Sequence, residues 1–380
     1  MNIAVDAISA GAGLGSSAGG MIVYFDGLLA ALARRDDVDR LISFVQPWAP
    51  DVGMPTDPKL DLKPCRGLPR NRFGRVVYEQ TIFPLAVDRG PAQVLFSTCN
   101  TRPLLLRKPN VVVLQSIQHV FFPSAFGTVR RAYLNAFVPR SLRTADAVIA
   151  VSAWEKQEAL HLFDLDPDRV FVVHHGVSNA IRAHAAATPS PSATRGGRPT
   201  IVMVSALYDF KNHRRLIEAF AALRREHDVP HELVIAGGPA DVTLEELQVV
   251  AARAGVSDRV RLLGPVPHEL VPRLLANAHV VAYPSLFETF GFPILEALSY
   301  GAVLVTSAAT SMPEVAGDAA ILVDPTDTAD LAAGLARAIF DRELRERLHA
   351  TGPGRAAEFT WERCADGTLA ALRFALEYPR

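Results

Sequence analysis

Several features that whole classes of protein depend on are scarce or absent in this sequence. It has only three cysteines in 380 residues, Cys65, Cys99 and Cys364, and they are widely spaced. A disulfide framework needs paired cysteines and a cysteine zinc site needs several at close spacing, so both are excluded and a reducing compartment is indicated. No apolar run approaches the roughly 20 residues that a membrane-spanning helix needs. The first residues, 1–6, read as a strand and not as a signal peptide, which predicts a cytoplasmic protein, with any membrane contact peripheral.

An excess of charge of either sign is also missing. Lysine and arginine number 39 against 40 aspartate and glutamate, a net charge of −1. Nothing global therefore predicts a nucleic-acid partner. The sequence has no Asp-x-Asp after a strand and no histidine pair at ligand spacing, so no metal site is expected.

The composition that is present describes a well-cored globular protein. Hydrophobic residues make up 49% of the chain, and its length favours two domains of ordinary size. Apolar strand-like runs alternate with helical patterns along the chain, which predicts an α/β fold with two doubly wound, Rossmann-like domains. The segment 184–199 is rich in Pro, Ser, Gly and Ala without apolar periodicity, and we interpret it as a linker.

The most informative stretch is 283–298. A short β-forming run ends at a Pro-Ser break, and a turn that carries Glu288 then leads into a helix with Glu296 about one turn inside it. Open α/β folds hold ligands at the carboxyl edge of the sheet, where this strand ends. The N–H groups from Phe290 to Ile294, at the helix start, favour an anion. Such amides beside two carboxylates suit a sugar that carries a phosphate.

The string Pro284-Ser-x-x-Glu-x-Phe-Gly-x-Pro-x-x-Glu-Ala297 resembles the signature of retaining GT-B glycosyltransferases of the "group 1" family, a family-4-like group with many bacterial mannosyl- and glucosyltransferases. Two glutamates at this spacing would be weak evidence alone, but further landmarks follow the family's order. The resemblance implies a GT-B fold, in which two Rossmann-like domains face each other across a cleft. Residues 1–183 would bind the acceptor and 200–358 the nucleotide sugar, and the helix 359–380 would pack back on the first domain.

The resemblance also implies an enzyme, a hexosyltransferase without a cofactor. It would move a hexose, mannose being favoured, from a GDP- or UDP-linked nucleotide diphospho-sugar to a hydroxyl of a glycan or polyprenyl-linked acceptor, with retained configuration, in cell-surface polysaccharide or glycolipid synthesis. Two alternatives remain open. One is a nucleotide-sugar 2-epimerase of the same fold, and the other is a non-catalytic nucleotide-sugar-binding subunit of a polysaccharide assembly.

Three residues are the catalytic candidates that the resemblance implies. Glu288 would hold the sugar or the positive charge that develops at its anomeric carbon, and the Lys211 ammonium would neutralise the leaving diphosphate. Many relatives carry His-Asp after the strand that here is 111–114, but Gln115 and Ser116 occupy those places. His119 either replaces that histidine or is a histidine on the rim.

The donor site that the resemblance implies is larger. Glu296 would hold the ribose hydroxyls, a glycine loop would face the donor phosphates, and backbone after a later strand would contact the base. A flexible βα loop, a tight turn and a surface lysine are the structural alternatives for Gly19-Gly20, Gly237 and Lys211 respectively. The expected donor-binding residues are Gly19, Gly20, Ser205, Lys211, Asn212, Gly237, Pro265, Val266, Phe290, Gly291, Phe292 and Glu296.

Arginines could supply positive charge in two places, beside Lys211 and in the first half of the chain. Many relatives carry an arginine where Ala206 stands, so Arg214 or Arg215 supplies a second charge, or Lys211 works with backbone amides alone. Arginines also gather in the first half of the chain, either as a solvated surface or as a basic patch for an anionic acceptor or the inner membrane leaflet. These arginines are Arg66, Arg70, Arg72, Arg75, Arg130, Arg131, Arg140 and Arg143.

Overall fold

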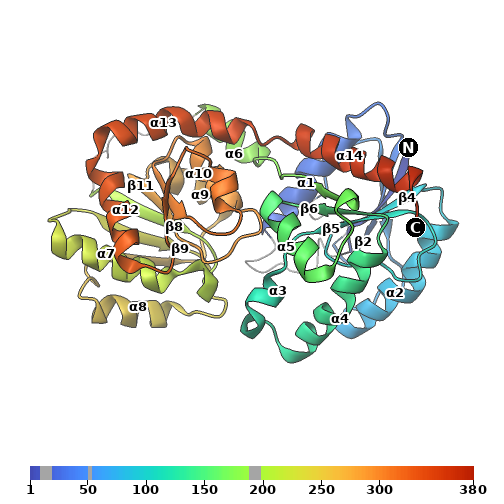
Figure 1. The fold of residues 1–380 in the computed structure, drawn as a ribbon, viewed down its shortest axis with the longest axis horizontal. Helices are drawn as coiled ribbons and strands as arrows, with labels where there is room; N and C mark the ends of the chain where they lie inside the picture. The colour runs from blue at the N-terminus through green and yellow to red at the C-terminus, as the bar shows by residue number, and fades with distance from the viewer. Residues whose placement is uncertain (9–18, 50–53, 188–197) are drawn as a thin grey trace. The chain divides into compact units, whose positions relative to one another are not determined.

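The computed structural model describes residues 1–8, 19–49, 54–187 and 198–380 (Figure 1). The chain divides into two compact units. The first consists of Met1–Gly176 together with Thr360–Arg380, and the second is Val177–Phe359. Each unit has one sheet in which every pair of neighbouring strands is parallel. The prediction of two doubly wound α/β domains is confirmed.

The first unit contains a seven-stranded sheet in the order β3-β2-β1-β4-β5-β6-β7. From β1 the chain builds outward to β3, and it then returns to β4 and builds toward the other edge. The order therefore reverses between β1 and β4, the kind of position at which doubly wound sheets open a crevice for ligands. The strands are β1 Asn2–Asp6, β2 Arg40–Val45, β3 Leu60–Pro64, β4 Val94–Ser97, β5 Asn110–Leu114, β6 Ala147–Ala150 and β7 Val170–Val172.

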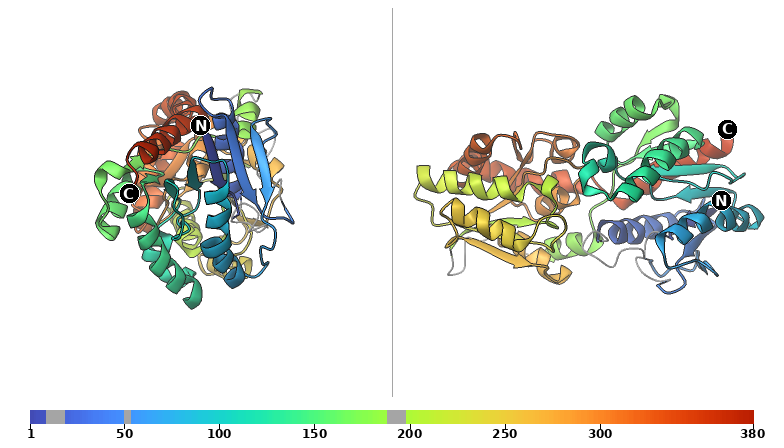
Figure 2. Two further views of the ribbon diagram at one scale, coloured as in Figure 1. Left: turned by 90° about the vertical axis from the view of Figure 1, so that its right-hand side faces the viewer. Right: turned by 90° about the horizontal axis from the view of Figure 1, so that it is seen from below.

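Helices cover both faces of this sheet (Figure 2). Helices α1 and α14 lie side by side, and α14 also contacts β4, β5, β6 and β7. Buried residues of α2 pack on the opposite face, as right-handed crossovers require for a chain that returns across its own sheet. The helices are α1 Gly19–Ala33, α2 Arg72–Arg89, α3 Gln118–Phe121, α4 Thr128–Thr144, α5 Ala153–Phe163 and α14 Trp361–Glu377, with 3-10 turns Pro123–Ala125 and Pro167–Arg169.

The second unit repeats this plan with a six-stranded sheet in the order β10-β9-β8-β11-β12-β13, which reverses between β8 and β11. Its strands are β8 Thr200–Val204, β9 Glu232–Ala236, β10 Val260–Gly264, β11 Val280–Tyr283, β12 Leu304–Ser307 and β13 Ile321–Val323. Its helices are α6 Asn179–Ala187, α7 His213–Glu226, α8 Leu244–Arg253, α9 Val271–Ala276, α10 Phe292–Ser299, α11 Met312–Ala316, α12 Thr328–Phe340 and α13 Arg342–Ala357, with 3-10 turns Asp209–Lys211 and His268–Leu270.

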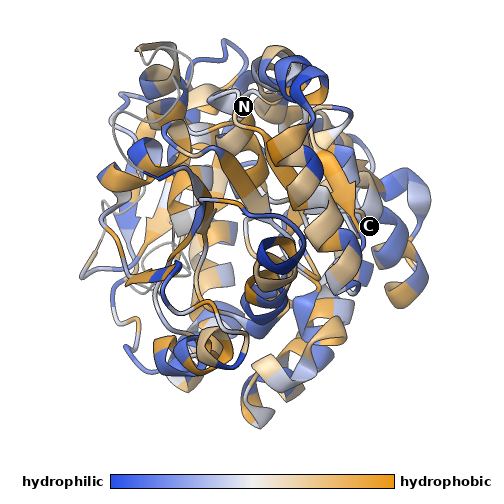
Figure 3. Ribbon diagram, turned by 90° about the vertical axis from the view of Figure 1, so that its left-hand side faces the viewer, coloured by the Kyte–Doolittle hydropathy of each residue, from blue (hydrophilic) through white to orange (hydrophobic). Residues whose placement is uncertain are grey.

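The central strands are apolar throughout because both faces of each sheet are covered. All residues of β4, β5, β6, β11 and β12 are buried. Figure 3 shows the same pattern by hydropathy, with predominantly hydrophobic strands and helices that carry both hydrophobic and hydrophilic residues.

The boundary between the units differs from the predicted linker 184–199. Helix α6 includes residues 184–187, and it contacts α9 and α10 of the second unit. The division by contacts accordingly falls after Gly176, and residues 188–197 lie outside the described residues. An alanine-rich run such as 184–187 is a good helix former, and composition alone did not distinguish it from a linker.

Candidate functional site

The predicted donor-site residues of the second unit follow neighbouring strands of its sheet. Ser205 follows β8, Gly237 follows β9 and Pro265 follows β10, while Pro284 follows β11. Because all these strands are parallel and adjacent, their carboxyl ends share one edge of the sheet. The reversal between β8 and β11 lies in the middle of this edge.

Three side chains form a closed network at that reversal. Lys211 Nζ lies 2.5 Å from Glu288 Oε1 and donates to the Tyr283 hydroxyl at 2.7 Å. The Tyr283 hydroxyl in turn donates to the same Glu288 oxygen at 2.6 Å. The Lys211 and Glu288 side chains are only 14% and 12% exposed. The structure thus joins the two catalytic candidates directly, through a tyrosine that the sequence analysis assigned only to a strand.

The loop that carries Lys211 is held by its neighbour. Asn212 has a φ of 70°, and its amide group donates to the carbonyls of Pro284 and Pro325 at 2.9 and 2.7 Å. Asparagine tolerates this left-handed conformation better than most residues. Asn212, which was predicted to bind the donor, therefore fixes the position of Lys211 relative to the strand end at Pro284.

The loop that carries Glu288 is held from the strand β12 side. The Glu288 N–H donates to Thr310 Oγ1 at 3.1 Å, and Ser311 Oγ donates to the carbonyls of Glu288 and Phe290 at 2.9 and 3.1 Å. Gly291 then takes a φ of 102°, which few residues other than glycine adopt, and α10 begins at the next residue. These bonds give the carboxylate of Glu288 a fixed place.

The start of α10 offers fewer donors than predicted. Pro293 has no N–H, and the Ile294 N–H donates to the Gly291 carbonyl at 3.0 Å. The prediction of anion-binding N–H groups from Phe290 to Ile294 is therefore wrong at Pro293 and Ile294. It remains a prediction for the N–H groups of Phe290, Gly291 and Phe292. A Pro at the first turn of a helix is common because an N–H there has no partner within the helix.

Glu296 lies in the second turn of α10 and is half-buried. Burial raises the pKa of Tyr283 well above its usual range, and the charges of Glu288 and Glu296 raise it further. Burial, followed by the charge of Glu296, raises the pKa of Tyr300 to about 12. Both tyrosines therefore stay protonated, so the Tyr283 hydroxyl remains a donor for Glu288.

Ser205 and Gly237 also have partners within the unit. Ser205 Oγ lies 3.0 Å from His213 Nε2. Burial lowers the pKa of His213 to about 4, with a smaller contribution from Lys211, so this imidazole is neutral near pH 7. A Cβ on Gly237 would come within 1.7 Å of the Ser205 carbonyl oxygen. Packing against Ser205 is thus sufficient reason for glycine at position 237.

The predicted site residues of the first unit lie in helices α1 and α3. Gly19 and Gly20 are the first residues of α1, and the glycine-rich residues 9–18 before them lie outside the described residues. His119 lies in α3 and is 3% exposed, with its ring against that of Phe126. His119 is therefore buried within the first unit. Burial, together with Arg130, lowers its pKa, so His119 is neutral near pH 7.

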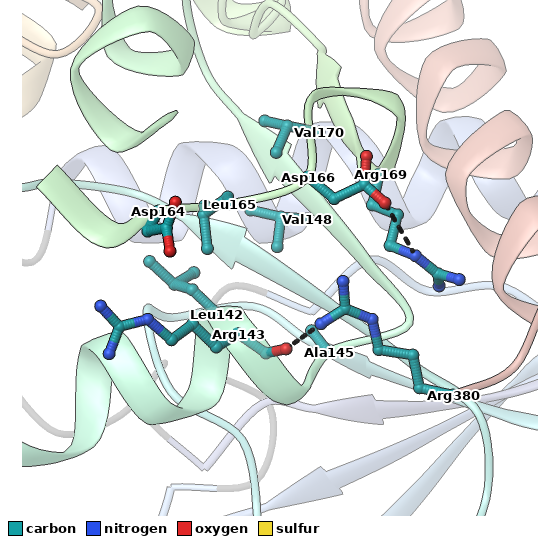
Figure 4. A pocket seen from close by; sticks show the side chains of 10 residues that line it. All are labelled: Leu142, Arg143, Ala145, Val148, Asp164, Leu165, Asp166, Arg169, Val170 and Arg380. Carbon is teal, nitrogen blue, oxygen red and sulfur yellow. Dashed lines mark hydrogen bonds and ion pairs between the residues drawn. The ribbon is translucent and has the colours of Figure 1, made fainter. Parts of the chain in front are cut away.

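A cavity of about 220 Å³ in the first unit lies near the start of β6 and β7. Figure 4 shows the Arg380 guanidinium directed at the Arg143 carbonyl, and Arg169 paired with Asp166. This cavity is lined by residues near the amino ends of the strands. The opposite edge of a doubly wound sheet is where ligands bind, and the arginines here hold local backbone.

No group of three or more His, Cys, Asp or Glu side chains is placed to hold a metal ion within the described ranges. In the same part of the chain, no helix is both long and apolar enough to cross a membrane.

Two family models match the chain over successive parts. The model described as "Glycosyl transferases group 1" matches residues 186–355. The model described as "Glycosyltransferase Family 4" matches residues 18–180. The two matches correspond closely to the two units.

Among curated proteins, the chain is 32% identical over 249 residues to O-antigen chain mannosyltransferase B of Escherichia coli, an alignment that covers 64% of this chain and 65% of that protein. It is 34% identical over 259 residues to the MMP alpha-(1->4)-mannosyltransferase of Mycolicibacterium hassiacum, covering 65% and 59% respectively. The chain thus spans less than two thirds of the length of either relative.

Among solved structures, sucrose-phosphate synthase from Thermosynechococcus elongatus matches with a TM-score of 0.72 and 19% identity, covering 99% of both chains. HepE from Anabaena, solved in complex with UDP and glucose, matches with a TM-score of 0.70 and 19% identity, covering 98% of this chain and 99% of that one. At these identities the likeness concerns the fold, and it confirms the predicted GT-B architecture.

Proposed function

From the matches of two glycosyltransferase family models to residues 18–180 and 186–355, we propose that the chain is a group 1 glycosyltransferase, a retaining hexosyltransferase that uses a GDP- or UDP-linked sugar. The hexose would pass to a hydroxyl of a glycan or polyprenyl-linked acceptor in the synthesis of a cell-surface polysaccharide or glycolipid. The observation that carries the proposal is the Lys211–Glu288–Tyr283 network at the reversal of the second sheet. Mannose is favoured because the two curated relatives described above are named mannosyltransferases.

The network has the two charges that the reaction requires. The bond between the anomeric carbon and the diphosphate oxygen breaks, a bond to the acceptor oxygen forms, and the acceptor hydroxyl loses its proton. The departing diphosphate oxygen takes up that proton. Negative charge grows on the diphosphate and positive charge on the sugar ring as the bond breaks, and preorganised groups of opposite charge stabilise both. Lys211 would serve the diphosphate and Glu288 the sugar.

The contacts leave capacity for both tasks. An ammonium has three donors, and the contacts with Glu288 and Tyr283 use two of those on Lys211. Both contacts to the Glu288 carboxylate go to Oε1, so Oε2 can accept from a sugar hydroxyl. A donor sugar diphosphate could therefore bind without breaking the network. The amides of Phe290, Gly291 and Phe292 and the Glu296 carboxylate would complete the donor site, toward the phosphates and the ribose respectively.

His119 would contribute in its neutral form. A buried, uncharged imidazole can exchange hydrogen bonds with sugar hydroxyls without competing for the diphosphate. Its Nε2 has no hydrogen-bond partner among the described residues. The backbone at Gly19 and Gly20 would face the donor phosphates, and Pro265 and Val266 would contact the base.

Contact with the inner leaflet of a membrane would bring the enzyme to a lipid-linked acceptor. Helix α2 exposes Phe73, Val77, Ile82 and Leu85, with Phe73 81% exposed. Exposed arginines, Arg72 among them, lie at its ends, and basic residues beside an apolar face favour an anionic membrane surface. Sedimentation with neutral and anionic phospholipid vesicles tests this, and Phe73→Asp should abolish binding to the anionic ones. Equal binding by Phe73→Asp would show that α2 is not the contact.

Transfer itself is tested with radiolabelled GDP-mannose, GDP-glucose, UDP-glucose and UDP-N-acetylglucosamine in the presence of a bacterial lipid extract. Labelled lipid or glycan formed by the wild type, and not by Glu288→Gln, supports the proposal. Conversion of the nucleotide sugar to its 2-epimer, or nucleotide-sugar binding with no turnover, would overturn it in favour of an epimerase or a binding subunit.

A further inference from the structure

A second group of charged side chains lies at the reversal of the first sheet, and none of them belongs to the donor site proposed above. Asp6 is the last residue of β1, and it is paired in register with Ser97, the last residue of β4. These are the two strands between which the order of the sheet reverses. In doubly wound sheets, ligands bind at the carboxyl edge where the strand order reverses, and Asp6 and Ser97 lie at that edge.

The alternation of residues along β1 determines on which face of the sheet Asp6 lies. Ala4 packs in a buried cluster with Tyr78, Phe83 and Val87 of α2. Alternate residues of a strand lie on the same face, so Asp6 lies on the α2 side of the sheet, one step nearer the edge. Leu95 belongs to the same cluster, and by the same rule Ser97 lies on this face beside Asp6.

Helix α2 adds one cation and a second carboxylate. Arg75 Nε lies 3.3 Å from Glu79 Oε1, and the two side chains are 27% and 17% exposed. Burial, followed by the charge of Asp6, raises the pKa of Glu79 to about 8 against the opposing effect of Arg75. Burial also raises the pKa of Asp6 to about 6, against the opposing effects of the Ile8 amide and Arg75. At neutral pH the group therefore consists of one carboxylic acid, one carboxylate and one guanidinium.

Three further titratable groups, Cys65, Cys99 and Tyr133, interact electrostatically with members of this group. Tyr78 is hydrogen-bonded to Cys65, and the charge of Arg130 acts on Cys99.

Two polar atoms of this region lack an internal partner. Ser97 Oγ is fully buried, and it has no hydrogen-bond partner among the described residues. The Arg75 Nε–H, although close to Glu79, makes no hydrogen bond within the described ranges. Buried polar groups in folded proteins are nearly always satisfied. Donors left over beside a carboxyl pair indicate a polar molecule that binds here.

We propose that Asp6, Glu79, Arg75 and Ser97 bind the hydroxyl groups of an uncharged sugar ring, at the acceptor position of the reaction. A carboxylic acid and a hydroxyl donate, a carboxylate accepts and a guanidinium donates, so the group matches ring hydroxyls, which do both. With one carboxylate and one guanidinium the group has no net charge at neutral pH, so the repulsion between a phosphate and Asp6 offsets its attraction to Arg75. The cluster therefore selects against an acceptor whose terminal sugar is phosphorylated. The acceptor position rests on the proposed function, whereas the binding of a sugar does not.

The experiment measures sugar binding without any donor. The probes are methyl α-D-mannopyranoside, methyl α-D-glucopyranoside and mannose 6-phosphate, followed by saturation-transfer NMR on the full chain. The variants are Asp6→Asn and Glu79→Gln, with Arg89→Gln as the control because Arg89 is an exposed residue in the last turn of the same helix. Binding of GDP and UDP to each variant shows that the protein is folded and that the donor site is intact.

We expect the wild type to bind a neutral methyl glycoside at least tenfold more tightly than mannose 6-phosphate, and Asp6→Asn to weaken that binding tenfold or more. Affinity of the wild type should fall as pH rises through about 8, where Glu79 ionises beside Asp6. Glu79→Gln should keep the neutral-pH affinity and lose this pH dependence, and Arg89→Gln should behave as the wild type.

Tighter binding of the phosphorylated sugar, unchanged affinity in Asp6→Asn, or the same pH profile in Glu79→Gln would each overturn the inference. Should Asp6→Asn fail to bind nucleotide and so prove misfolded, the Glu79→Gln pH profile decides alone. A protein that transfers sugar, but whose acceptor KM is unaffected by Asp6→Asn, would retain the proposed function and lose this site. A protein that binds methyl glycosides through Asp6 but takes no nucleotide sugar would retain the site and lose the function.

Discussion

Replacing Lys211 by methionine should lower both stability and turnover. The side chains of Lys211 and Glu288 are 14% and 12% exposed, so the pair lies near the buried limit. Removing one partner of a buried ion pair costs about 3–5 kcal/mol because the other charge is left uncompensated. We expect a loss of unfolding free energy at the lower end of this range, about 3 kcal/mol, because both side chains keep some exposure and the Tyr283 hydroxyl still donates to Glu288. Turnover should fall by two or more orders of magnitude, about 3 kcal/mol, as for the loss of one preorganised donor.

A second substitution separates the two effects. In Lys211→Met/Glu288→Leu the ion pair becomes an apolar contact, and such replacements are often neutral or stabilising. Urea unfolding should then recover most of the free energy lost in the single variant, while turnover at saturating donor stays abolished. Arg224→Gln is the matched control on α7, because its pair with Asp258, at 3.5 Å, is largely solvent-exposed on the aspartate side, and such pairs contribute less than about 1 kcal/mol.

The neighbouring arginines define the result that would refute this reasoning. Arg214 pairs with Asp209 and Glu246, and Arg215 donates to the Asn212 side chain and the Pro325 carbonyl. Both arginines are thus engaged in structural contacts. Turnover in Lys211→Met above about a third of the wild-type value, under 1 kcal/mol, would mean that one of them serves the diphosphate. Lys211→Arg should restore only part of the activity, since a planar fork does not place its charge where an ammonium does. An arginine at Ala206 should rescue some activity in Lys211→Met.

The remaining predictions concern individual side chains. Tyr283→Phe removes a hydroxyl that bonds both partners of the network, and it should lower the free energy of unfolding in urea by about 1–3 kcal/mol; an unchanged midpoint would contradict the network. Glu296→Ala should weaken donor binding by about 1.5–3 kcal/mol in calorimetry, and an unchanged dissociation constant would remove Glu296 from the site. Burial lowers the pKa of His231 and of its partner His279 to about 4, so stability present above pH 6.5 should be lost as pH falls toward 4. Replacing both by glutamine should flatten this acid-side decline in urea unfolding, and an equally steep decline would assign it to other groups.

The sequence predicted the fold well because the central strands are buried on both faces and therefore apolar throughout. Runs such as Val111–Leu114 and Val280–Tyr283 have no other stable place in a chain of this length. The misplaced boundary at 184–199 shows the limit of composition. Alanine favours a helix, and only the contacts of α6 with the second unit decided where these residues belong.

The sequence predicted individual site candidates but not the contacts between them. The resemblance gave Glu288 and Lys211 as catalytic candidates, yet 77 residues separate them, and nothing local shows that they touch. The role of the Tyr283 hydroxyl was not predicted, because tyrosine is common in strands and its position at a strand end indicates no further function. The resemblance predicted Asn212 as a donor-binding residue; the structure adds its hydrogen bonds to the Pro284 and Pro325 carbonyls, which no local sequence pattern indicates.

At each of the two sheet reversals a basic side chain lies beside a glutamate, and the stability of the fold does not explain why. At one, Glu288 is paired with Lys211. At the other, Arg75 lies 3.3 Å from Glu79, whose raised pKa of about 8 keeps it a carboxylic acid at neutral pH. A buried ion pair is a poor source of stability, because taking both charges out of water offsets most of their attraction. If folding alone were served, apolar side chains would do as well at either place. A charge pair that hydrogen bonds hold at the edge where a doubly wound sheet opens, as they hold Lys211 and Glu288, is better explained by a ligand that it meets. The unfolding free energy of Lys211→Met/Glu288→Leu measures this directly: a double variant as stable as the wild type, and inactive, assigns the pair to function.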